Sequence, residues 1–143
     1  MTLWTAQVPG GRPQGLTVSS TLVADGDPGR LLGLVDEESE LWAAASAAGR
    51  FAVAVLGPAH RQLADRFAGL LPAPGGPFTG YGWRESGFGP VPADAVTWAG
   101  CRLAEVRPVG WALLVEAVIE QVALSDGRPL VHYRGRYREL NLE

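Results

Sequence analysis

The sequence predicts a mainly β fold, an antiparallel barrel with two short covering helices, formed as a single domain over residues 1–143. About seven segments have the apolar or alternating pattern of strands, and only two have helical spacing. The strands do not alternate with helices as they do in a doubly wound sheet. The 143 residues are 47% hydrophobic and 19% charged, so the chain can bury one substantial core.

Most of the predicted strands are bounded by Gly or Pro turns. The segment "PGGRP" at 9–13 has hairpin chemistry, and "GDPG" at 26–29 forms another turn before the apolar run "RLLGLV". The segment 111–124 contains helix formers, but its β-branched residues favour a strand. We expect strands at 2–8, 14–24, 30–35, 51–56, 96–107, 111–124 and 129–133.

Capping residues and apolar spacing predict the two helices. Ser39 is a suitable N-cap for a helix over 40–48, because Glu40 lies in its first turn and Gly49 occupies the position after its end. Pro58 opens a second helix, along which apolar residues recur at helical spacing: Leu63, Phe67 and Leu70.

The segment 72–92 is expected to be a loop without regular structure, because 11 of its 21 residues are Gly or Pro. A loop of this length within a small domain more often serves a function than not. We interpret it as a functional segment or as one that contacts a second subunit.

Charge and cysteine content exclude several classes of protein. The net charge of −3 argues against nucleic-acid binding, which requires a basic face. Cys101 is the single cysteine and His60 and His132 are the only histidines, so we expect no disulfide framework and no metal site. The first residues have neither the basic start of a signal peptide nor a long apolar run. We therefore expect no membrane segment and a cytoplasmic location.

The sequence contains no motif for covalent catalysis or for a phosphate loop. It has no GxxxxGK[ST] loop and no G-x-S-x-G elbow, and "GYGWRESG" lacks the spacing of a dinucleotide-binding fingerprint. The remaining candidates are hydroxyls and helix amides. Thr17 and Ser19 lie on one face of a predicted strand and Ser20 on the other, while Ser39 and the amides behind it form a candidate anion site. Such groups suit a phosphorylated, planar cofactor.

Six segments together resemble one family. In order they are "GLTVSS", "DP" at 27–28, "LVDEES", "AAGRFAVAVL", "QLADRFAG" and "RPLVHYRGRY". Their succession, in register from about Thr5 to Tyr137, resembles the flavin reductase-like, FMN-binding split-barrel family. The resemblance implies a homodimeric split β-barrel that binds FMN, with FAD as an alternative, near the subunit interface.

The resemblance also implies which residues contact the flavin. Thr17, Val18, Ser19 and Ser20 would line the flavin ring and ribityl chain, and the turn with Asp36 and Ser39, before the first helix, would hold the phosphate. Phe51 and Ala52 begin the strand that would run along the ring, and Tyr133 and Arg136 of the closing motif would complete the pocket or the interface. The implied cofactor-binding residues are Thr17, Val18, Ser19, Ser20, Asp36, Ser39, Phe51, Ala52, Tyr133 and Arg136.

One motif of the family is missing. Reductases of this family carry Gly-Asp-His before the long penultimate strand, and the histidine is associated with the nicotinamide donor. The corresponding residues here are Val109, Gly110 and Trp111. Trp111 either stacks over the flavin in the place of the donor, or receives a different aromatic substrate, or belongs to the core. No other residue is assigned a catalytic role.

Three functions remain open. The first is a flavin oxidoreductase that moves hydride from NAD(P)H to flavin, needs no side-chain nucleophile, and supplies reduced flavin to a partner monooxygenase. The second is an FMN-binding split-barrel protein or electron carrier that does not use nicotinamide. The third is a homodimer without a cofactor. Retention of flavin separates the third from the others, and bleaching by NADH separates the first from the second.

Overall fold

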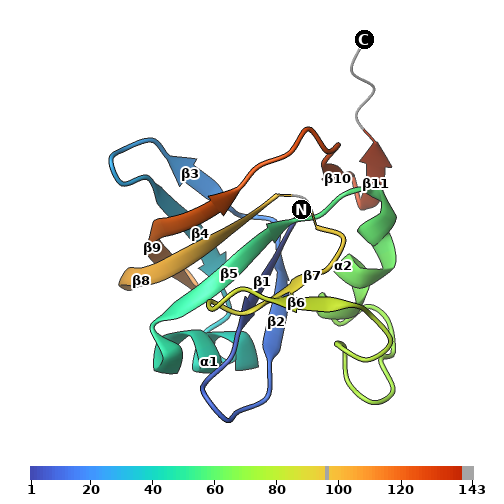
Figure 1. Cartoon of the computed structure of the whole chain (residues 1–143), viewed down its shortest axis with the longest axis horizontal. Helices are drawn as coiled ribbons and strands as arrows, with labels where there is room; N and C mark the ends of the chain where they lie inside the picture. Colours follow the sequence, from blue (N-terminus) through green and yellow to red (C-terminus); the bar gives the residue numbers. More distant parts are fainter. Residues whose placement is uncertain (96, 140–143) are drawn as a thin grey trace.

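The structure, a computed structural model, describes residues 1–95 and 97–139. Seven strands form one antiparallel sheet in the order β2-β1-β5-β8-β9-β4-β3, and two small hairpins flank it. Figure 1 shows α1 at one end of the curved sheet and α2 beside it near the chain termini. The predicted mainly β fold with two short helices is confirmed.

Outside the segment 72–92, the elements follow the predicted order with three differences. The segment 14–24 divides into two strands, a final strand follows residue 133, and the strand expected at 96–107 begins at Trp98, with Val96 outside the described residues. The helices are α1 (Glu40–Ala48) and α2 (Arg61–Phe67), preceded by the 3₁₀ turn η1 (Pro58–His60). The strands are β1 (Thr2–Ala6), β2 (Gln14–Val18), β3 (Leu22–Ala24), β4 (Arg30–Val35), β5 (Arg50–Val55), β6 (Trp83–Glu85), β7 (Pro90–Pro92), β8 (Trp98–Val109), β9 (Ala112–Ala123), β10 (Leu130–Tyr133) and β11 (Arg136–Glu139).

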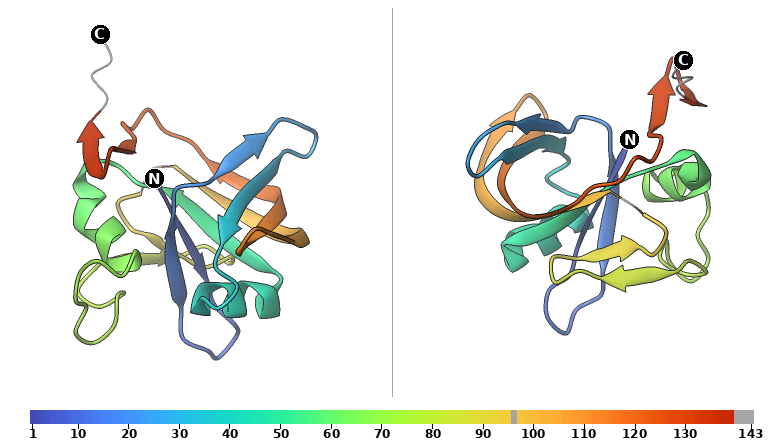
Figure 2. Two further views of the ribbon diagram at one scale, coloured as in Figure 1. Left: turned by 180° about the vertical axis from the view of Figure 1, so that it is seen from behind. Right: turned by 45° about the horizontal axis from the view of Figure 1, so that its top comes forward.

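The two edge strands of the sheet, β2 and β3, are consecutive in the chain. Residues 19–21 leave the edge beside β1 and join the edge beside β4, which explains why the predicted strand 14–24 is interrupted. We call this crossing segment, residues 19–21, the seam. Ser20 links it to β4, because its hydroxyl accepts the Leu34 N–H at 3.1 Å and donates to the Leu34 carbonyl at 3.2 Å. The strong curvature that brings the two edges near each other is visible in Figure 2.

The main core fills the concave side of the sheet. Trp4 and Phe51 stack there with ring centroids 4.6 Å apart and planes 13° from parallel. Aliphatic residues of β4, β9 and α1 surround the pair. Because aromatic rings bury large apolar areas, this stack contributes much of the hydrophobic stabilisation of the barrel.

Helix α1 is capped at both ends as its sequence predicts. The Ser39 hydroxyl accepts the N–H of Trp42, and Gly49 follows the helix with a left-handed φ of 74°. Its buried residues, Leu41, Ala44 and Ala45, pack on the main core. No described helix is long and apolar enough to cross a membrane.

The prediction that segment 72–92 lacks regular structure is wrong. Strands β6 and β7 pair as a hairpin within it, and its aromatic residues pack on α2. The rings of Phe67 and Phe78 meet edge-on at 4.8 Å, and Trp83 lies 5.8 Å from Phe67. The apolar area of these rings offsets the flexibility of the many glycines.

The closing strands β10 and β11 form a hairpin beside the N-terminus. The N–H of Leu130 donates to the Leu56 carbonyl at 2.6 Å, and the Met1 ammonium donates to the Leu130 carbonyl at 2.7 Å. The Tyr137 hydroxyl donates to Asp65 of α2 at 2.6 Å. These contacts fix the hairpin at the end of the molecule opposite α1, as Figure 1 shows.

Candidate functional site

The segment expected to line a flavin ring lies at the seam. Thr17 donates its hydroxyl to the Ala64 carbonyl at 2.7 Å, and Val18 is buried. Ser20 is engaged with Leu34, whereas Ser19 is exposed. Because β2 is an edge strand, the backbone N–H and C=O groups along one of its sides have no partner strand among the described residues, and groups of this kind bind planar, amide-like ligand edges. The segment therefore offers main-chain groups and Ser19, while Thr17 and Ser20 support the fold.

The turn between β4 and α1 is strongly acidic and internally hydrogen bonded. Asp36 accepts the Glu38 N–H through Oδ1 at 2.9 Å. The Ser39 hydroxyl donates to the Asp36 carbonyl at 2.7 Å and accepts the Trp42 N–H at 3.2 Å. Four carboxylates fall within five residues, at positions 36, 37, 38 and 40. The anion site expected at Ser39 thus has its hydroxyl committed to the helix cap.

Trp111 forms the tip of the long β8–β9 hairpin and is fully exposed, at 103% of its reference area. A two-residue turn, Gly110 and Trp111, connects Val109 to its partner Ala112. Gly110 has a φ of 57°, which glycine adopts without strain. The pairing of Val35 with Leu113 places this tip beside the acidic turn that follows β4. The interpretation of Trp111 as a core residue is therefore wrong.

The structure does not bring the remaining predicted residues to this end of the sheet. Phe51 stacks on Trp4 inside the barrel, and Ala52 lies beneath the β6–β7 segment. Both side chains are buried, so neither is exposed to a ligand in a single copy of the chain. Tyr133 and Arg136 face each other across the β10–β11 hairpin, near α2. Their role in flavin binding stays a prediction, because a single copy of the chain does not place them beside the other predicted flavin contacts.

The chain matches the model of the "Flavin reductase like domain" over residues 1–141. The chain belongs to the flavin reductase-like family. This flavin reductase-like protein is 30% identical over 135 residues to the reductase subunit HsaB of a flavin-dependent monooxygenase from Mycobacterium tuberculosis, covering 92% of this chain and 71% of that one. It is 32% identical to FMN reductase (NADH) RutF 1 of Methylorubrum extorquens, covering 96% and 68%.

Solved structures agree with the family assignment. A nitrilotriacetate monooxygenase component B homologue from Mycobacterium thermoresistibile superposes with a TM-score of 0.86 at 28% identity, over 98% of this chain and 78% of that one. The flavin reductase PheA2 superposes with a TM-score of 0.88 at 22% identity, over 99% and 89%. These superpositions confirm the split-barrel type of fold for the flavin reductase-like chain.

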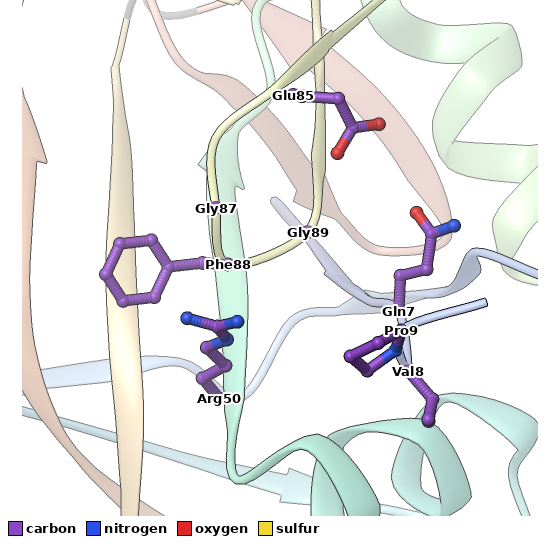
Figure 3. A pocket seen from close by; sticks show the side chains of 8 residues that line it. All are labelled: Gln7, Val8, Pro9, Arg50, Glu85, Gly87, Phe88 and Gly89. Atoms are coloured by element: carbon purple, nitrogen blue, oxygen red, sulfur yellow. The ribbon is translucent and has the colours of Figure 1, made fainter. Parts of the chain in front are cut away.

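A polar hollow of about 290 Å³, which sequence reasoning missed, lies between the sheet and the β6–β7 hairpin of this flavin reductase-like protein. Figure 3 shows Arg50 and Glu85 on opposite sides of it, with Gln7 nearby and the Phe88 ring to the left of the Arg50 side chain. The hairpin sits close to the sheet because Gly89 and Gly100 lack side chains: a Cβ on Gly89 would lie 2.5 Å from the Thr5 carbonyl oxygen. No sequence motif signals such a hollow.

A second missed feature is a hydrogen-bonded group around Asp94. The His60 ring is buried; its Nδ1 accepts the Gly57 N–H at 2.9 Å, so its Nε2 carries the hydrogen and donates to Asp94 at 2.9 Å. The Tyr81 hydroxyl also donates to Asp94, at 3.2 Å. Burial alone would raise the pKa of Asp94, but the hydrogen bonds from His60 and Tyr81 outweigh it and hold the pKa below its usual value. Among the described residues, no cluster of three or more His, Cys, Asp or Glu could hold a metal.

Proposed function

We propose that this protein, as a single flavin reductase-like domain, transfers hydride from NAD(P)H to a flavin in the cytoplasm and supplies the reduced flavin to a separate monooxygenase. Relatives named as monooxygenase reductase subunits and as NADH-dependent FMN reductases support this reaction. FMN is the flavin that the family implies, and FAD is the alternative. The protein binds and orients the reactants, and the hydride chemistry belongs to the nucleotides.

The observation that carries this proposal is the free edge of β2 together with the exposed indole of Trp111. The free edge of β2 offers alternating donors and acceptors to a flavin ring, and Trp111 stands at the same end of the sheet as the turn following β4. An indole face stacks on planar rings. The ring-binding function of Ser19 and Trp111 is therefore the most direct use of these groups.

We propose that the protein acts as a homodimer, because an apolar face is left uncovered in a single copy. A hollow of about 360 Å³ lies at the mouth of the barrel, between β1, β5, β8 and β9. Exposed aliphatic side chains border it, among them Leu124 at 81% and Val23 at 65% exposure. A second copy would bury these side chains, which a soluble monomer rarely exposes together.

Sedimentation of the Leu124→Glu variant tests the dimer. We expect this variant to sediment as a monomer while the unaltered protein sediments as a dimer. Leu70→Glu is the matched control, because Leu70 is similarly exposed, at 70%, but lies after α2, outside the barrel mouth. A dimer that survives Leu124→Glu but not Leu70→Glu would place the interface elsewhere.

An anaerobic visible spectrum tests the reaction. The purified protein is mixed with flavin and then with NADH or NADPH, and flavin with donor alone serves as the background. We expect bleaching of the flavin band faster than the background. Ser19→Tyr should block the seam and slow bleaching, whereas Ser46→Tyr, at an exposed position on α1, should not.

The replacement of the family's histidine by Trp111 favours one alternative, a flavin-binding carrier that does not use nicotinamide. Flavin that binds but is not bleached by either donor would establish this alternative. A protein that binds no flavin would be the cofactor-free homodimer, and the proposed reductase function would be wrong.

A further inference from the structure

We infer that this protein holds its flavin by the ring and not by a phosphate, so that riboflavin binds at least as tightly as FMN. The inference rests on the proposed flavin reductase function and names the form of flavin that the site accepts. It follows from a disagreement between the family's phosphate position, the turn from Asp36 to Ser39, and the charges and hydrogen bonds found there.

The charge of this turn opposes a phosphate. Asp36, Glu37 and Glu38 are exposed one after another, and Glu40 follows in the first turn of α1. A phosphate monoester carries about −1.5 to −2 charges near pH 7. Bringing it to four carboxylates is unfavourable, and the partial positive charge of a helix N-terminus, about half an elementary charge, does not compensate.

Three donors of the turn, the Glu38 N–H, the Ser39 N–H and the Ser39 hydroxyl, are already used within the turn. The Glu38 N–H donates to the Asp36 carboxylate, and the Ser39 N–H donates to the Asp36 carbonyl at 3.1 Å. The Ser39 hydroxyl both donates to Asp36 and accepts from Trp42. A phosphate would have to displace the Asp36 carboxylate from Glu38, or break the helix cap, to gain these donors.

Neighbouring arginines do not reverse the charge. Arg107 of β8 pairs with Leu114 of β9, which in turn pairs with Leu34 of β4, so Arg107 lies two strands away from β4. It borders a small hollow together with Glu105 and Glu116. Arg30 and Arg102 lie farther from the turn, in the row of Val118, and each is paired with a carboxylate: Arg30 with Glu116 at 2.7 Å and Arg102 with Glu120 at 3.6 Å. The carboxylates of this region therefore outnumber its cations among the described residues.

The groups expected to contact the flavin ring do not repel the ligand as the acidic turn repels a phosphate. The free edge of β2 and the exposed Trp111 are uncharged, and an isoalloxazine ring needs only hydrogen bonds and a stacking surface. Affinity should then come from the ring, which riboflavin and FMN have in common. The phosphate of FMN should add nothing or weaken binding, and the diphosphate of FAD should do the same.

Quenching of flavin fluorescence, titrated at low ionic strength, tests the inference. We expect riboflavin to bind as tightly as FMN and FAD or more tightly. Glu37→Gln combined with Glu38→Gln should tighten FMN binding roughly fivefold, because two repulsive charges are removed, and leave riboflavin within about twofold. The FMN gain should shrink as salt is added.

A control with the same change in net charge is Asp25→Asn combined with Asp126→Asn, at two exposed positions away from the turn. This control should leave the riboflavin-to-FMN ratio unaltered. FMN bound tenfold or more tightly than riboflavin by the unaltered protein would overturn the inference alone and point to cations from a second copy. Failure of all three flavins to bind would overturn the proposed function together with the inference.

Discussion

The ring of Trp4 lies directly against the α-carbon of Gly33, so that a Cβ at position 33 would overlap Cζ2 of the indole. Gly33 is on β4 and Trp4 on β1, and the contact crosses the inside of the barrel. The glycine thereby lets the stacked pair Trp4 and Phe51 occupy the core without displacing β4.

Gly33→Ala should therefore destabilise the fold by about 1–3 kcal/mol, the usual cost of overpacking a close-packed core. Urea unfolding monitored by tryptophan fluorescence measures this change. Gly82→Ala is the control, because its Cβ would meet Ala93 at an ordinary 3.5 Å and its φ is not in the left-handed region. Equal stability of the two variants would show that Trp4 moves aside at little cost.

Asp94→Asn should make the stability of the protein less dependent on pH in the acid range. The folded state holds the pKa of Asp94 below its usual value of 3.8, so the ionised carboxylate contributes stability above that value and loses it as the pH falls through the lowered pKa. The unfolding free energies of wild type and variant should differ at pH 7 and converge as the pH falls below 3.8 and through the lowered pKa. A difference that stays constant throughout this range would show that Asp94 ionisation is not linked to folding.

Tyr137→Phe should loosen the closing hairpin and destabilise the protein by about 1 kcal/mol, the typical net value of one hydrogen bond. Burial and the Asp65 carboxylate raise the pKa of Tyr137 to about 12. A raised pKa means that this stabilisation is present below pH 10 and is lost as the pH rises toward 12. Absorbance titration should show a phenolate component near pH 12 that the variant lacks. Tyr133→Phe, in the same hairpin but exposed, should leave stability unchanged.

The sequence was sufficient for the fold wherever local chemistry decides the structure. Ser39 and Gly49 bound α1 as predicted, because capping depends on residues close together in the chain. It was insufficient for segment 72–92, whose order comes from Phe78 and Trp83 packing on α2, a contact that no local pattern encodes.

The candidate site divides in the same way. Ser19 and Ser20 lie in the segment that the sequence predicted. The hydrogen-bond partners of the hydroxyls in this segment, Ala64 for Thr17 and Leu34 for Ser20, depend on tertiary structure. The position of Trp111 beside the acidic turn also follows from the pairing of Val35 with Leu113, which is a property of the assembled sheet.

Trp111→Ala should weaken flavin binding by about 1 kcal/mol, the usual contribution of one aromatic stack, without changing the unfolding free energy. Stability should be preserved because the side chain is fully exposed at a two-residue turn and contributes nothing to the core. Trp111→Phe should retain most of the affinity, since it keeps a stacking face, and Val109→Ala controls for the loss of apolar area at the same hairpin. If alanine at position 111 leaves the affinities for riboflavin and FMN and the rate of bleaching by NADH unaltered, the hairpin tip lies outside the flavin site. If it leaves affinity unaltered but raises the bleaching rate, the indole occupies the place of the nicotinamide, and its removal opens that place to the donor.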